Sequence, residues 1–173
     1  GIDINPADGS IWYSRLFGDK IGRIDPDTLK VKEFDSPVRG PRRMRFNHLD
    51  GTLWLTGYSE GQLARITTSA NGFESKVYAL PEFAEGYGPA PYALGVHPKT
   101  GDVWLNENMT DRFFRFIPGE ERFVVYPVPL TGTYTRDFSF TEGGKACTSN
   151  NPLPMASLEG GVAEILCIEL MEE

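Results

Sequence analysis

Apolar residues recur along this chain in short runs that are separated by turns rich in glycine, proline and aspartate. Short apolar runs bounded by such residues are typical of β-strands. The run between residues 90 and 130 shows the pattern well, because it predicts strands near 92–97, 102–106, 112–117 and 122–126. The 3.6-residue periodicity of an amphipathic helix is absent. The pattern predicts an all-β fold of short antiparallel strands.

The pattern repeats around three tryptophans, at intervals of 42 and 50 residues, in the tetrads Ile11-Trp12-Tyr13-Ser14, Leu53-Trp54-Leu55-Thr56 and Val103-Trp104-Leu105-Asn106. An arginine follows eleven residues after each tryptophan, as Arg23, Arg65 and Arg115. Repeats of about 40–50 residues with four strands each are typical of β-propeller blades. We therefore expect blades over approximately 1–37, 38–81, 82–129 and 130–173. The recurrence of the tryptophans and arginines favours a structural role for all six.

The fourth unit is degenerate, with strands expected near 137–141, 145–149 and 163–170 and no clear outermost strand. The first unit keeps only the end of its inner strand, near 2–5. The count is about three and a half blades, and a closed propeller has roughly 4–8. We expect a partial propeller, completed by a further stretch of the same chain or by a partner subunit. The N-terminal segment of the protein would then supply the missing outer strand.

Composition narrows the function classes. The chain has 173 residues and a net charge of −7, which disfavours nucleic-acid binding because phosphate contacts need a basic face. No apolar run reaches the ~20 residues of a membrane span. Cys147 and Cys167 fall on two expected strands of the fourth blade, so they form either a disulfide or a pair of buried thiols. A disulfide would indicate a periplasmic or secreted protein, and a cytoplasmic location stays open.

Residues 90–96 and 101–108 read Ala-Pro-Tyr-Ala-Leu-Gly-Val and Gly-Asp-Val-Trp-Leu-Asn-Glu-Asn, and an earlier unit contains Ile21-Gly22-Arg23-Ile24. These three segments resemble the repeat of the streptogramin (virginiamycin B) lyase family, whose blades are related to NHL-type propellers. The resemblance implies a seven-bladed propeller that opens a cyclic depsipeptide by elimination at its ester. It also implies a Mg²⁺ ion and a histidine base just after the blade proline. This chain has Arg42, Tyr92 and, by looser alignment, Arg136 at that position.

Antiparallel neighbours bring the start of each inner strand and the end of the second strand to one rim of the central channel. Such a rim is the default ligand site of a propeller. Arginines there can clamp a carboxylate, phosphate or sulfate. The candidate ligand-binding residues are Arg42, Arg43, Tyr58, Tyr92, Asn108, Arg136, Asp137, Asn150 and, beside it, Asn151.

Glu107 is the candidate catalytic base and metal ligand, since a carboxylate can bind Mg²⁺ or accept a proton. The alternative is that it accepts backbone hydrogen bonds or pairs with an arginine. His48 and His97 are expected to be solvated turn residues. Two functions stay open: a C–O lyase of the virginiamycin B lyase type acting at the rim, or a non-catalytic propeller that binds a small anionic ligand or a protein partner.

Overall fold

The computed structural model describes residues 1–130, 132–150 and 164–170, and these contain strands and no helix. The described residues therefore include no helix that could span a membrane. The strands are β1 (Ile2–Ile4), β2 (Ile11–Arg15), β3 (Lys20–Ile24), β4 (Val31–Asp35), β5 (Pro41–Phe46), β6 (Leu53–Gly57), β7 (Gln62–Thr68), β8 (Phe73–Ala79), β9 (Pro91–Val96), β10 (Val103–Glu107), β11 (Arg112–Ile117), β12 (Arg122–Pro127), β13 (Phe138–Phe140), β14 (Ala146–Ser149) and β15 (Ile165–Ile168).

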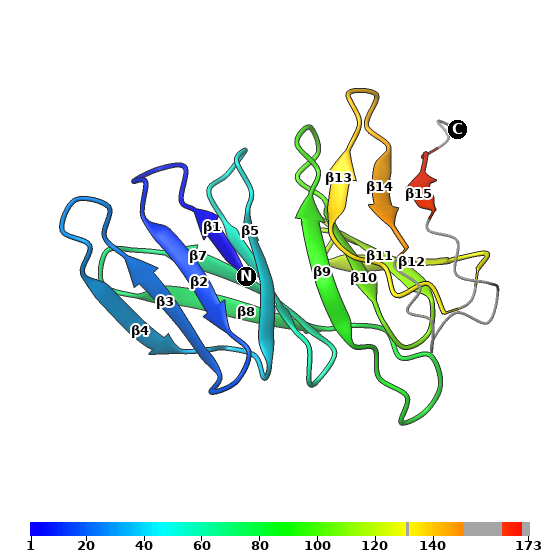
Figure 1. The fold of residues 1–173 in the computed structure, drawn as a ribbon, viewed down its shortest axis with the longest axis horizontal. Coiled ribbons are helices and arrows are strands. Elements are labelled where there is room, and N and C mark those ends of the chain that lie inside the picture. The colour runs from blue at the N-terminus through cyan, green and yellow to red at the C-terminus, as the bar shows by residue number, and fades with distance from the viewer. Residues whose placement is uncertain (131, 151–163, 171–173) are drawn as a thin grey trace.

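The strands form four antiparallel sheets in chain order, β1-β2-β3-β4, β5-β6-β7-β8, β9-β10-β11-β12 and β13-β14-β15. Figure 1 shows β5 and β9 in the middle of the arc, with β1 and β13 on either side of them. Each sheet therefore contributes its first strand to the inside, as a propeller blade does. The predicted all-β fold of antiparallel blades is confirmed, and the fourth sheet has three strands within the residues that the structure describes.

The core lies between neighbouring sheets. Trp12 of the first sheet packs with Leu53, Leu55 and Ile66 of the second, and Trp54 packs with Val103 and others of the third. Trp104 packs in the same way against the fourth sheet, in a cluster that includes Phe138 and Ala146. The three tryptophans are at most 2% exposed, which confirms their predicted place in the core.

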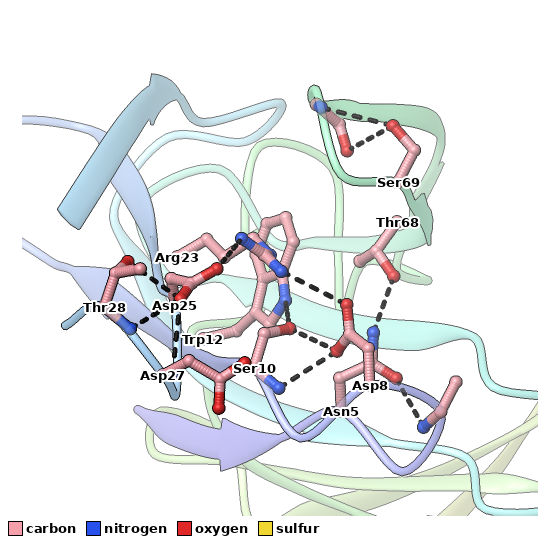
Figure 2. Close-up of polar contacts among 12 residues, drawn as sticks. Asn5, Asp8, Ser10, Trp12, Arg23, Asp25, Asp27, Thr28, Thr68 and Ser69 are labelled. Carbon is pink, nitrogen blue, oxygen red and sulfur yellow. Dashed lines mark hydrogen bonds and ion pairs between the residues drawn. The ribbon is translucent and has the colours of Figure 1, made fainter. Parts of the chain in front are cut away.

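Each tryptophan stands opposite the repeated arginine on the neighbouring strand, in the register pairs Trp12↔Arg23, Trp54↔Arg65 and Trp104↔Arg115. Figure 2 shows the first of these pairs, in which Arg23 contacts Asp8 while the Trp12 indole donates to the Ser10 hydroxyl. Arg65 forms an ion pair with Asp50, and Arg115 forms one with Asp102, in which Nη2 of Arg115 lies 2.6 Å from the carboxylate. The arginines therefore brace the turn between the two inner strands of their blade, as their recurrence predicts.

The fourth blade replaces this tryptophan–arginine pair by a disulfide. Cys147 of β14 and Cys167 of β15 stand opposite each other, and their sulfur atoms are bonded. Cys147 is the second residue of β14, as Trp104 is of β10, and each pairs with a residue on the third strand of its blade. Of the two roles that the sequence left open for these cysteines, the structure has the disulfide.

His97 differs from the prediction of a solvated turn residue, because it is only 7% exposed. Its Nδ1 accepts the backbone N–H groups of Lys99 and Thr100 at 3.3 and 3.2 Å, which leaves the proton on Nε2, 3.2 Å from the Gly144 carbonyl oxygen. In the second blade Asn47 fills the same position and accepts from Leu49. The imidazole thus replaces an amide oxygen as the turn acceptor. His48 is exposed, as expected.

Candidate ligand site at the channel rim

The strand pairing brings the predicted rim residues to one edge of the arc. Pro41 at the start of β5 pairs with Gly57 at the end of β6, and Pro91 at the start of β9 pairs with Glu107 at the end of β10. In the fourth blade the Arg136 N–H donates to the Ser149 carbonyl at 3.2 Å. Starts of inner strands and ends of second strands therefore share an edge, as the antiparallel order requires.

Two β-bulges shape this edge. The register shifts between Pro41 and Met44 in β5, and again between Leu105 and Glu107 in β10. A bulge bends its strand and redirects the side chains next to it. Arg42 and Arg43 lie inside the first bulge, so their backbone does not follow the regular ladder.

Three polar side chains of second strands hold the backbone of the rim, and the sequence analysis did not identify their role. Ser14 donates its hydroxyl to the Arg42 carbonyl at 2.6 Å, and the Asn106 side-chain amide donates to the Arg136 carbonyl. The Thr56 hydroxyl accepts the Arg43 N–H at 2.9 Å. Their common position, two residues after Trp12, Trp54 and Trp104, is the signal that would have found them. They fix the backbone from which the rim arginines project.

Arginine and tyrosine side chains from three blades meet at this edge. The guanidinium carbon of Arg42 lies 3.7 Å from the ring centroid of Tyr92 and 5.2 Å from that of Tyr58. Arg136 lies 4.6 Å from the Tyr92 centroid and 5.1 Å from that of Tyr134. These are cation–π distances, so the Tyr92 ring is shared by two cations. We call these five residues the arginine–tyrosine cluster.

The arginines at this edge differ in whether a carboxylate pairs with them. Asp137 forms an ion pair with Arg43, whose Nε lies 3.0 Å from its carboxylate, and accepts a hydrogen bond from Nη2 of Arg45 at 3.2 Å, so it pairs with two arginines of β5. Across residues 1–130, 132–150 and 164–170, neither Arg42 nor Arg136 has a carboxylate within ion-pair distance. Two guanidinium groups thus meet at one ring without a counter-charge from the described chain.

The pKa of Tyr92 is lowered from its ordinary value of 10.0. Burial acts to raise it, but the Arg42 hydrogen bond and the positive charges of Arg42, Arg136 and Arg43 together outweigh that effect. Positive charge near a phenol favours the phenolate, because it stabilises the ionised form. The cluster therefore stabilises negative charge at the Tyr92 oxygen.

A cavity of about 260 Å³ opens beside the cluster and is lined by Gly1, Ser14, Leu16, Pro41, Arg42, Arg43 and Tyr92. Arg42 and Arg43 give this cavity two positively charged side chains in its wall. Arg42 and Tyr92 belong both to the cavity wall and to the cluster. Arg136 instead lines a second hollow, of about 430 Å³, together with Asp137, so the two unpaired guanidinium groups border different hollows beside the cluster.

Glu107 is the last residue of β10, and its side chain contacts the turn between β10 and β11 rather than the cluster. Its carboxylate accepts the N–H groups of Met109 and Thr110, each at 2.7 Å, and the Thr110 hydroxyl. Arg112 Nε is 3.9 Å from the carboxylate, whose side chain is fully buried. The sequence left Glu107 either as a base and metal ligand or as an acceptor of backbone hydrogen bonds. In the structure it accepts backbone hydrogen bonds.

The described residues do not fit the Mg²⁺ ion that the resemblance implies. Mg²⁺ needs oxygen ligands in near-octahedral geometry, and both Glu107 oxygens already accept hydrogen bonds from the turn. No group of three or more His, Cys, Asp or Glu side chains gathers within the described part of the chain.

The remaining rim candidates lie at the ends of second strands. Asn108 is half-buried, and its backbone N–H donates to the Ala90 carbonyl at 3.3 Å. The side-chain amide of Asn108 has no hydrogen-bond partner among the described atoms. The backbone N–H of Asn150 donates to the Glu164 carbonyl at 3.0 Å. Asn150 therefore helps to join the described segments of the fourth blade. Asn151 lies outside the described residues.

No protein-family model and no curated protein matches the chain. Solved structures do match it. A streptogramin B lyase structure aligns over 100% of this chain and 55% of its own length, with a TM-score of 0.74 and 22% identity. Virginiamycin B lyase from Staphylococcus aureus aligns over 99% and 56%, with a TM-score of 0.73 and 19% identity. An auxiliary nutrient binding protein from Bacteroides ovatus aligns over 97% and 42%, with a TM-score of 0.66 and 11% identity.

These likenesses concern the fold. The chain spans about half the length of the two lyase structures. It has a streptogramin B lyase-like propeller fold, which confirms the resemblance seen in the sequence. Because one fold carries many functions, the activity of those proteins does not transfer with it.

Proposed function

We propose that this chain, with its streptogramin B lyase-like fold, is part of a propeller that binds an anionic ligand at the channel rim. The ligand class is a carboxylate, sulfate or phosphate. The observation that carries the proposal is the meeting of Arg42 and Arg136 at Tyr92, without an ion pair to either arginine in the described chain. Guanidinium groups bind such anions in paired hydrogen bonds, which fixes orientation as well as charge.

A C–O lyase activity of the virginiamycin B lyase type is the second candidate. It is supported by the alignment of the lyase structures over the whole of this chain. It would need a metal ion and a base from residues other than Glu107. The bound anion would then be part of the substrate.

The rest of the propeller is the proposed partner of this chain, either as a further stretch of it or as a separate subunit. The support is the open face of the first blade, where Ile2 and Ile4 are 61% and 56% exposed. The disulfide supports a location in the periplasm or outside the cell, where such bonds persist.

Sulfate binding measured by isothermal titration calorimetry at low ionic strength tests the anion site. We expect Arg42→Gln and Arg136→Gln each to weaken sulfate binding about tenfold, because each removes a charge-assisted contact. Arg122→Gln is the matched control, since Arg122 lies on the outer strand β12 and pairs with Glu120. Equal affinities in the two rim variants and the control would contradict the proposed site.

A further inference from the structure

Asn106, in β10, is fully buried and contacts the backbone of two neighbouring blades. We propose that Asn106 is a positioning residue of the anion site, because its amide holds Arg136 beside Tyr92. This proposal rests on the anion-binding function given above. It assigns part of the anion affinity to a side chain that lies behind the rim and not on it.

The two ends of the Asn106 amide bind different blades. Its Oδ1 accepts the backbone N–H of Ala93 at 3.0 Å, and Ala93 follows Tyr92 in β9. Its Nδ2 donates to the backbone carbonyl of Arg136, in the segment before β13 of the fourth blade. Because a backbone N–H donates and a carbonyl accepts, these two partners fix which way the amide points. One side chain therefore joins the strand of Tyr92 to the backbone of Arg136.

Two further hydrogen bonds of the Arg136 backbone lie within its own blade. The Arg136 carbonyl accepts the Thr148 hydroxyl at 3.2 Å, and the Arg136 N–H donates to the Ser149 carbonyl at 3.2 Å. Both partners belong to β14, the neighbour of β13. These bonds fix Arg136 relative to the fourth blade. The Asn106 bond fixes it relative to the third blade, where Tyr92 lies.

The equivalent residue of the first blade holds the other arginine of the cluster. Ser14, like Asn106, lies two residues after the tryptophan of its blade. Its hydroxyl donates to the Arg42 carbonyl of the second blade at 2.6 Å. Arg42 and Arg136, which have no carboxylate partner in the described chain, are thus each held at the carbonyl by the preceding blade. The same restraint therefore occurs at both cations of the site.

Such a restraint matters here because the two cations repel each other. The guanidinium carbons of Arg42 and Arg136 lie 3.7 and 4.6 Å from the Tyr92 ring centroid. Like charges at this separation favour a wider spacing, so a loosened Arg136 would move away from the ring. Paired hydrogen bonds to an anion need donors that are already in place. Asn106 is fully buried, so it acts through Arg136 and not on the anion itself.

The first test compares Asn106→Thr with Asn106→Val, two variants of nearly equal shape that differ by one hydroxyl group. A threonine hydroxyl can accept and donate at once, as Thr56 does with the N–H and carbonyl of Arg43 at 2.9 and 3.3 Å. In the calorimetric sulfate experiment we expect Asn106→Val to weaken binding about fivefold and Asn106→Thr to recover most of that loss. Asn106→Leu carries the same expectation as Asn106→Val and replaces it where the valine variant does not fold. Equal losses in the valine and threonine variants would overturn the proposal.

A double variant separates positioning from a general loss of stability. Added to Arg136→Gln, Asn106→Val should change sulfate affinity by less than about twofold, because it acts through the arginine that is already removed. Thr52→Val is the matched control, since Thr52 is buried and its hydroxyl donates to Asp50 before the start of β6, at the end of that strand away from the rim. It should lower the free energy of unfolding and leave sulfate affinity unchanged. Additive losses in the double variant, or an equal loss in Thr52→Val, would assign Asn106 a structural role only.

The position of Arg136 can also be followed without sulfate, by nuclear magnetic resonance. The Nε–H resonance that disappears in Arg136→Gln should carry the ring-current shift of a group beside two tyrosine rings. The shift should shrink in Asn106→Val and return in Asn106→Thr. This result in a chain that binds no sulfate would refute the anion site and leave Asn106 as the residue that positions Arg136. Sulfate binding with the same affinity and the same resonance in Asn106→Val would refute the role of Asn106 and leave the anion site.

Discussion

Replacing Glu107 by alanine is expected to destabilise the chain by about 3–5 kcal/mol, the usual cost of breaking a buried ion pair by removing one partner. The variant would leave the N–H groups of Met109 and Thr110 without their acceptor. It would also leave Arg112, which is 7% exposed, without its nearest carboxylate. Urea unfolding followed by tryptophan fluorescence measures the change.

Glu85→Ala is the control for this substitution, because Glu85 is exposed and should change the free energy of unfolding by no more than about 0.5 kcal/mol. Sulfate affinity at the rim should be the same in folded Glu107→Ala as in the unmodified chain. A loss of stability no greater than that of the control would show that the turn does not depend on Glu107. Its carboxylate would then be available for a ligand.

Replacing Trp54 by alanine is expected to cost about 3–5 kcal/mol, as large-to-small substitutions of buried aromatic residues do. Trp54 is fully buried between the second and third blades, with ring contacts to Phe116 at 5.5 Å and Tyr78 at 6.5 Å. The indole fills space between two sheets whose backbones are fixed by their own ladders. The cavity left behind therefore cannot collapse fully.

Phe17→Ala provides the comparison, since Phe17 is 87% exposed and should change the free energy of unfolding by no more than about 0.5 kcal/mol. The same chemical unfolding measurement serves both variants. A Trp54→Ala chain as stable as Phe17→Ala would mean that the blades do not pack through the tryptophans. The description of the core between the sheets would then be wrong.

The fold could be predicted from the sequence because of the repeat. In each of the first three blades the tryptophan pairs with the arginine eleven residues later, so this spacing predicts how the second strand pairs with the third. The antiparallel order also brings Arg42, Tyr92 and Arg136 to one edge, because it depends only on strand direction. Both features follow from the backbone.

The chemistry of the rim depends on side-chain contacts that no pattern contains. Nothing in the sequence says that Arg42 and Arg136 share the Tyr92 ring, since they belong to different blades. The Glu107 carboxylate turns back to its own loop, and His97 takes the place of an asparagine in a turn. In both cases backbone N–H groups of the same turn donate to the side chain. The spacing of residues in the sequence does not predict these local hydrogen bonds.

A crystal structure of the chain in the presence of selenate tests the central claim most directly, because selenium is located by its anomalous scattering. We expect a selenium peak beside Tyr92, within hydrogen-bond distance of the guanidinium groups of Arg42 and Arg136. The peak should be absent from Arg136→Gln crystals grown in the same way. An empty rim in the unmodified chain, with selenate bound at other arginines, would contradict the claim that this cluster is an anion site.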